Sequence, residues 1–311
     1  MKLNKKFILT FSMACMMLVA NAQQDAMYTQ YMFNTLAINP AYAGSRNVTS
    51  ATALFRNQWT GIDGAPKTGT ITLDAPVFDK RIGLGVQFIS DKLGITQTNT
   101  GVISAAYRIR MDEGTLAFGI QGSVSQFRAD YTSVLLNSPG SGYDPAFADN
   151  VSKTLFNFGT GVYYNSDKFY IGLSAQDLIS NKLTPYESPN TDLRNTQSMH
   201  LFLASGYVFS LSEDFKFKPS FLIKGVKGAP IEGDINATLW IKDVIGLGAQ
   251  YRTSADVAGL IEIQATPQIR IGYSYDYSTT ALKAFNSGSH EIMLRYEFGF
   301  GKGKILSPRY F

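Results

Sequence analysis

The sequence is poor in the residues that carry most catalytic and metal chemistry. Its 311 residues include one cysteine and two histidines. The cysteine, Cys15, lies in an amino-terminal segment that we expect to be removed. The mature chain would then have no disulfide, no thiol nucleophile and no thiolate metal site. We predict no cofactor, no metal site and no enzymatic activity, because no catalytic constellation can be assembled from the remaining residues.

Charged residues are also scarce. They form 17% of the chain, against about 25% in typical soluble proteins, while aromatic residues form 13%. The formal net charge of +4 falls to +1 without the first 22 residues, which contain three lysines and no acid. Nucleic-acid binders usually have a strong basic excess. We therefore predict no nucleic-acid partner and a surface that tolerates apolar contact.

The chain has no hydrophobic run long enough for a transmembrane helix. The longest, Phe7–Ala20, is shorter than the about 20 apolar residues that a spanning helix needs. It follows three lysines and ends at the small-x-small sequence Ala20-Asn21-Ala22. This order predicts a secretory signal peptide over residues 1–22. A lipid anchor on Cys15 is the alternative, although the residues before it lack the expected leucine.

From about residue 48 onward, apolar side chains recur at every second position. Near the carboxyl end, Ile292, Leu294 and Tyr296 share one face, and Arg295 and Glu297 share the other. A period of two predicts β-strands with unlike faces. About fourteen such segments begin near residues 48, 67, 80, 97, 114, 153, 168, 198, 214, 232, 243, 256, 267 and 290.

The connections between these segments alternate in length. One set is tight, near 77–79, 111–113, 165–167, 211–213, 242–243 and 266–267, whereas the other contains the long connections 129–152, 177–197 and 278–289. Short periplasmic turns and long extracellular loops are typical of outer-membrane barrels. A soluble β-sandwich also alternates, but it predicts no such parity and a charged outer face. Here the polar face is expected to be mostly Gly, Ser, Thr, Asn and Gln, which fits a barrel lumen.

We therefore predict an all-β protein, a transmembrane antiparallel β-barrel of about 14 strands over residues 48–301. A non-barrel segment, 23–47, precedes it, and a tail, 302–311, follows it in the periplasm. The tail's basic and aromatic residues would either bind a periplasmic component or seal the barrel. Aromatic residues near strand ends would form girdles at headgroup depth, or simply reflect strand propensity: Trp59, Tyr107, Tyr164, Tyr207, Trp240, Tyr251 and Tyr277.

The segment 23–47 is too rich in aromatic residues for a disordered leader. We expect it to pack either inside the barrel as a plug or against a periplasmic partner. Its run Gln24–Asn34 and the following Ile38–Gly44 closely resemble the amino-terminal signature of PorP/SprF-like proteins. The run Leu294–Phe298 resembles the carboxyl-terminal part of the same proteins. The residues that carry this signature are Tyr28, Gln30, Tyr31, Asn34, Asn39, Pro40, Ala41 and Gly44. One departure is Ala26, where proline is expected.

The resemblance implies an outer-membrane protein of the type IX secretion and gliding systems of Bacteroidota. Such a barrel would work with the type IX translocon or its periplasmic ring. It would either support secretion generally or hold a secreted surface protein, often a large adhesin, by its C-terminal sorting domain. The resemblance implies this role but identifies no binding residue in this sequence. A pore for small solutes is the alternative, because fourteen strands can enclose an aqueous lumen.

Candidate binding residues lie on the long loops, because exposed aromatic and large apolar side chains anchor protein interfaces. We expect these to include Tyr131, Leu135, Tyr143, Phe147 and Tyr186. Acid–base chemistry at the outer rim would depend on the two histidines, His200 and His290, each of which begins a predicted strand. It is disfavoured because Glu291 points to the opposite strand face from its neighbour His290.

Overall fold

The computed structural model describes residues 27–133, 149–183, 196–227 and 229–298. The predicted signal peptide, the tail 302–311 and the loop residues Leu135, Tyr143, Phe147 and Tyr186 lie outside these ranges. Among the described residues, no helix has the length and apolar character needed to cross a bilayer.

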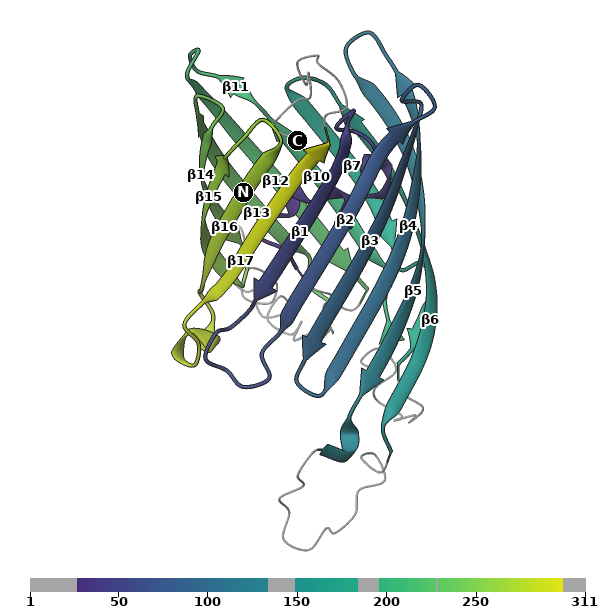
Figure 1. Cartoon of the computed structure of the whole chain (residues 1–311). Helices are drawn as coiled ribbons and strands as arrows, with labels where there is room; N and C mark the ends of the chain where they lie inside the picture. The colour runs from purple at the N-terminus through teal and green to yellow at the C-terminus, as the bar shows by residue number, and fades with distance from the viewer. Residues whose placement is uncertain (1–26, 134–148, 184–195, 228, 299–311) are drawn as a thin grey trace, which may run out of the picture.

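Fourteen antiparallel strands close into a barrel (Figure 1). They are β1 (Thr49–Asn57), β2 (Lys67–Val77), β3 (Ile82–Leu93), β4 (Thr96–Arg110), β5 (Thr115–Ala129), β6 (Val151–Asn165), β7 (Phe169–Gln176), β10 (His200–Tyr207), β12 (Phe215–Val226), β13 (Glu232–Ile241), β14 (Ile245–Arg252), β15 (Asp256–Gln264), β16 (Ile269–Ser278) and β17 (Ser289–Phe298). Each strand start is within two residues of its predicted position, so the predicted fold is confirmed.

The remaining elements are short. β11 (Phe209–Ser210) extends the pairing along β12, and β8 (Asn181–Lys182) pairs with β9 (Thr196–Gln197) in a separate small sheet. Single turns of 3-10 helix lie at η1 (Tyr31–Phe33), η2 (Thr35–Ala37), η3 (Pro40–Tyr42), η4 (Tyr131–Ser133) and η6 (Ala281–Ala284). The first three precede the barrel.

The pairing of β1 with β17 joins the first and last strands. Its register sets Thr49 opposite Phe298 and Asn57 opposite His290. With this pair and the β10–β12 pair, the sheet has no open side. Closure satisfies the backbone hydrogen bonds of the strands without water, as a lipid environment requires.

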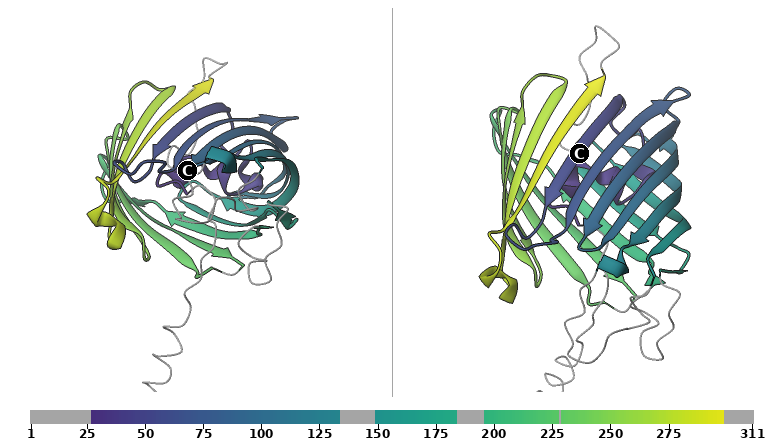
Figure 2. Two further views of the ribbon diagram at one scale, coloured as in Figure 1. Left: turned by 90° about the horizontal axis from the view of Figure 1, so that it is seen from below. Right: turned by 60° about the horizontal axis from the view of Figure 1, so that its bottom comes forward.

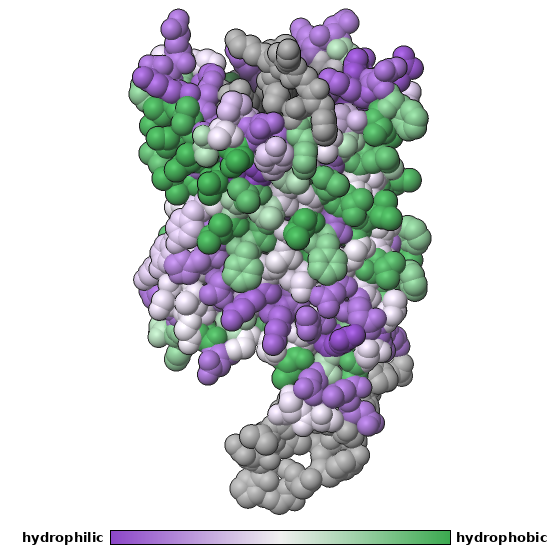
Figure 3. Space-filling view, in the orientation of Figure 1, coloured by the Kyte–Doolittle hydropathy of each residue, from purple (hydrophilic) through white to green (hydrophobic). Residues whose placement is uncertain are grey.

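The two faces of the barrel differ as the alternation predicts. Outward side chains are apolar and exposed, as Ile71 (60%) and Ile103 (69%) illustrate. Figure 3 shows this exterior as a hydrophobic band between more polar regions above and below it. The band is the expected lipid-facing surface of a membrane barrel.

The expected aromatic girdle is only partly correct. Tyr107, Tyr251 and Tyr277 are outward and exposed. Trp240 is buried on the inward face of β13, and the Arg270 guanidinium lies 4.8 Å from its ring centroid. Trp240 was misplaced because aromatic character near a strand end does not reveal which face the side chain occupies.

The two ends of the barrel differ in their connections. At one end the strands are joined by 78–81, 111–114, 166–168, 211–214, 242–244 and 265–268, and at the other by 58–66, 94–95, 130–150, 177–199, 227–231, 253–255 and 279–288. All of the long connections leave the second end, at the bottom of Figure 1. We call this the extracellular end and the other the periplasmic end, following the usual asymmetry of such barrels.

Candidate functional site in the barrel lumen

Residues 28–46 lie inside the barrel, where they cross the lumen (Figure 2). We call them the lumen segment. Its three short helices are almost completely enclosed, and Thr29, Gln30 and Ala41 have no exposed surface. The last helix, η3, packs against β4, β5 and β6. The segment is therefore packed like a protein core.

Local sequence explains the turn that starts η3. The Asn39 side chain accepts a hydrogen bond from the Ala41 N–H at 2.9 Å, and Pro40 occupies the first helical position. Asn is a favoured N-cap, and proline is tolerated there because that position needs no N–H donor. The Asn39 amide also donates to the Val162 carbonyl at 3.0 Å. One side chain thus shapes the segment and attaches it to β6.

Inward-facing glycines make room for the segment. A Cβ on Gly83 would lie 1.8 Å from the Ala43 carbonyl oxygen, and one on Gly119 would lie 2.2 Å from the Ala41 nitrogen. A Cβ on Gly272 would lie 2.2 Å from the Gln30 side-chain oxygen. Two of these contacts involve backbone, which cannot move aside as a flexible side chain does. The barrel wall is therefore shaped to this segment.

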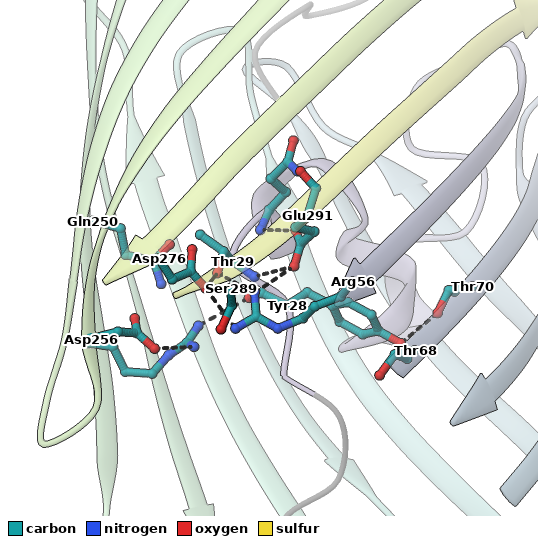
Figure 4. Close-up of polar contacts among 12 residues, drawn as sticks. Tyr28, Thr29, Arg56, Thr68, Thr70, Gln250, Asp256, Asp276, Ser289 and Glu291 are labelled. Carbon is teal, nitrogen blue, oxygen red and sulfur yellow. Dashed lines mark hydrogen bonds and ion pairs between the residues drawn. The ribbon is translucent and has the colours of Figure 1, made fainter. Parts of the chain in front are cut away.

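The carboxylate of Glu291 holds the beginning of the segment (Figure 4). It accepts hydrogen bonds from the backbone N–H of Thr29 at 2.9 Å and of Gln30 at 2.8 Å. The Gln30 amide donates to the Glu291 carbonyl at 3.2 Å. Hydrogen bonds to an ionised acceptor are about twice as strong as neutral ones.

An arginine completes this cluster. The Arg56 guanidinium pairs with Asp276 at 2.7 Å and with Glu291 at 3.1 Å, and it donates to the Thr29 hydroxyl at 2.9 Å. That hydroxyl in turn donates to Asp276 at 2.7 Å. All of these side chains are buried, so each charge has partners that offset its desolvation.

A second arginine lies beside the first described residues. Arg252 forms a two-point contact with Asp234, at 2.9 and 3.0 Å, and lies 3.4 Å from Asp256. It also donates to the Tyr28 carbonyl at 3.3 Å. The Tyr28 hydroxyl hydrogen-bonds to Thr70 at 2.7 Å. The segment is thus attached to strands on both sides of the lumen.

The other end of the segment has its own ion pair. The Arg46 guanidinium contacts the Glu297 carboxylate through its Nε at 2.7 Å. The Gly44 N–H donates to Asp74 at 2.8 Å, and Gly44 has a φ of +70° that favours glycine. Both ends of the segment are therefore held by buried charges.

The charge on the inward face was underestimated from the sequence. We expected mainly small and uncharged polar residues there. Among the described residues, the buried inward side chains of the strands include Arg56, Arg108, Arg252, Arg270, Arg295, Lys218, Lys224, Asp74, Asp234, Asp256, Asp276, Glu262, Glu291 and Glu297. The bases and acids in this set balance, and they occupy inward positions of the strand alternation. That pattern is visible in the sequence, but the pairing across strands is not.

The eight predicted signature residues all lie buried in the lumen segment. Of the predicted loop residues, only Tyr131 is described. It lies in η4, directly after β5, and packs on a small cluster formed by Phe127, Ala129, Val151 and Leu155. This cluster lies at the extracellular ends of β5 and β6, where the loop 130–150 begins.

The two histidines lie on different faces. His200 is buried in the lumen, with its Nδ1 3.8 Å from Asp177. His290 points outward, and its Nδ1 is 2.7 Å from the Tyr273 hydroxyl. The two rings cannot serve one acid–base site. Within the described ranges, no three His, Cys, Asp or Glu side chains are placed to hold a metal ion.

Structural comparison shows what the fold is similar to. The CymD monoaromatic hydrocarbon channel superposes with a TM-score of 0.50 at 11% identity, covering 88% of this chain and 93% of CymD. A Pseudomonas aeruginosa FadL homologue gives 0.49 at 14% identity, covering 90% and 96%. Omp33 of Acinetobacter baumannii gives 0.49 at 8% identity, covering 81% and 98%. At such identities the CymD likeness concerns the barrel fold alone.

Sequence comparison gives the family. No curated protein matches the sequence. Residues 20–296 match the family described as "Type IX secretion system membrane protein PorP/SprF". This match includes the lumen segment and nearly all of the barrel, so the chain belongs to the PorP/SprF family of type IX secretion system membrane proteins.

Proposed function

We propose that this outer-membrane barrel is a docking protein, which binds a secreted surface protein by its C-terminal sorting domain and holds it at the cell surface. The observation that carries the proposal is the occupied lumen. A polypeptide segment held by a buried ion pair and by hydrogen bonds to a buried carboxylate crosses the space that a solute would need. The family adds the context, because type IX membership links the barrel to protein secretion.

The occupied lumen disfavours the alternative of a solute pore. Opening a path would separate Arg46 from Glu297 and would remove the Thr29 and Gln30 N–H groups from the Glu291 carboxylate. Breaking a buried pair by removing one partner costs about 3–5 kcal/mol. The fit of Gly83 and Gly119 against the backbone of the segment adds to the cost of moving it.

The extracellular end provides the surface for a partner. β4, β5 and β6 have 15 residues each, whereas several other strands have 8 to 10, and their long extracellular ends are visible in Figure 1. The cluster beneath Tyr131 supports the start of the 130–150 loop. Aromatic side chains on a supported loop are suited to anchoring a folded protein.

In this proposal the barrel makes and breaks no covalent bond. A folded sorting domain leaving the translocon would meet the long loops, and slow dissociation would retain it. Components of the translocon or its periplasmic ring would approach from the opposite end, where short turns leave the barrel rim accessible. Outer-membrane lipid would surround the hydrophobic band between the two ends of the barrel.

The test is affinity purification of the tagged protein from native outer membranes, followed by mass spectrometry. We expect one large surface protein with a C-terminal sorting domain. We also expect Tyr131→Ala to reduce its recovery, while Phe285→Ala, in the loop 279–288, leaves it unchanged. Recovery of translocon and ring components alone would support a general secretion role instead. Recovery of neither would favour the pore.

A further inference from the structure

We infer that the lumen segment passes through the barrel from the periplasmic end to the extracellular end, so that Met27 faces the cell exterior. The segment joins β1 at Thr49, which lies at the periplasmic end of that strand. Along β2 and along β17, its contacts with the wall lie nearer the extracellular end as the residue number falls. The inference concerns topology and does not depend on the proposed partner.

Strand β2 provides one measure of depth. β2 begins at the extracellular end with Lys67 and ends at the periplasmic end with Val77. Three of its inward side chains bond to the segment in order: Asp74 to the Gly44 N–H at 2.8 Å, Thr72 to the Asn34 side chain at 3.3 Å, and Thr70 to the Tyr28 hydroxyl at 2.7 Å. The segment therefore runs along β2 toward the extracellular end.

Strand β17 provides an independent measure. It runs the opposite way, from Ser289 at the extracellular end to Phe298. Glu297 binds Arg46, near the last residue of the segment, whereas Glu291 binds Thr29, near the first. Glu297 is six positions after Glu291, which corresponds to about 20 Å along a strand. The two ends of the segment therefore lie near opposite ends of the barrel.

The partners of Tyr28 place it close to the extracellular mouth. Its carbonyl accepts from Arg252, the last residue of β14. Arg252 also contacts Asp256, the first residue of β15, and the connection between these strands belongs to the extracellular end. Figure 4 shows Tyr28 and Thr29 among these strand ends. Met27 precedes them and is half-buried.

Chain length then limits where the mature terminus can lie. With cleavage after Ala22, four residues precede Met27. Four extended residues span at most about 14 Å, less than the about 20 Å between the two carboxylates along β17. The return path through the lumen is also filled by the segment itself. We therefore expect the mature amino terminus to be accessible from the exterior.

Cysteine labelling on intact cells tests this topology. Cys15 is the one cysteine of the chain, so a Cys15→Ser background gives a clean label. We would compare Met27→Cys with Phe285→Cys in an extracellular loop and Phe78→Cys in a periplasmic turn, both of which are more than 70% exposed. The reagent is a membrane-impermeant maleimide. An epitope inserted after Gln24, detected by antibody on intact cells, gives a second readout.

We expect Met27→Cys and Phe285→Cys to be labelled to the same extent before and after permeabilisation, and Phe78→Cys to be labelled only afterwards. The epitope should be detected on intact cells. Labelling of Met27→Cys only after permeabilisation would overturn the inference. Absence of labelling in both states, together with no surface signal from the epitope, would overturn it equally.

Discussion

Arg56 on the first strand lies directly opposite Glu291 on the last, and their side chains form a buried ion pair at 3.1 Å. The same carboxylate accepts the N–H groups of Thr29 and Gln30. The Glu291 carboxylate thus connects the first and last strands and also attaches the lumen segment where these strands pair. The same few side chains therefore help to close the barrel and to fill its lumen.

Replacing the Glu291 carboxylate should destabilise both the junction of the first and last strands and the attachment of the lumen segment. Glu291→Gln removes the charge opposite Arg56 and leaves one acceptor oxygen for the two backbone N–H donors that the carboxylate accepts. Because Arg56 keeps Asp276 as a partner, we expect a loss at the lower end of the range for buried pairs, about 3 kcal/mol. Urea unfolding of the detergent-solubilised barrel measures this loss. Glu113→Gln, in an exposed periplasmic turn, is the control. Equal midpoints for the two variants would show that the contact contributes nothing.

The fit between the barrel wall and the lumen segment can be tested by adding one methyl group to the wall. Gly83→Ala would bring a Cβ within 1.8 Å of the Ala43 carbonyl oxygen, so the segment or β3 must shift. Overpacking of this kind costs about 1–3 kcal/mol. We expect a lower midpoint of the gel shift that distinguishes folded from heat-unfolded barrel.

The matched control for this substitution is Gly259→Ala on the outward face of β15, where a Cβ meets no atom within 4 Å. It should keep the wild-type midpoint. If Gly83→Ala also keeps that midpoint, the lumen segment does not pack against β3 as described.

The lipid-facing band predicts a different response to charge. Ile71→Lys places an ammonium near the middle of β2 on the exposed face. At the bilayer midplane such a change costs about 2–4 kcal/mol, and near the interface about 0–1 kcal/mol. Phe78→Lys, in a periplasmic turn, should therefore be nearly neutral. Reversible unfolding in lipid vesicles measures the free energy of unfolding of the two variants. If water rather than lipid surrounded the barrel, the two free energies would be similar.

The strands could be predicted from the sequence because the alternation of apolar and polar residues is visible within each strand alone. Alternation such as Ile292, Leu294 and Tyr296 requires no knowledge of neighbouring strands, and the turns are marked by local composition. Strand starts were accordingly predicted to within two residues. The family signature likewise lies within one continuous run of residues.

The contents of the lumen could not be predicted in the same way. Arg56 and Glu291 are 235 residues apart, and only the register of the first and last strands sets them opposite each other. Gly83 makes room for Ala43 through a contact that no local pattern records. Trp240 was misassigned because its place near a strand end does not reveal its face, and its contact with Arg270 joins strands that are not neighbours in the sequence. Interior charge could be read from the alternation, but the pairing required the closed barrel.

The most direct test of a closed lumen is the ion current through the purified full-length protein in a planar lipid bilayer. Insertion is verified in parallel by protease protection of the barrel in vesicles of the same lipid. With residues 28–46 in place, we predict an inserted barrel with no steady current. A steady current proportional to voltage, from protein whose segment is intact, would contradict the closed lumen and favour a solute pore.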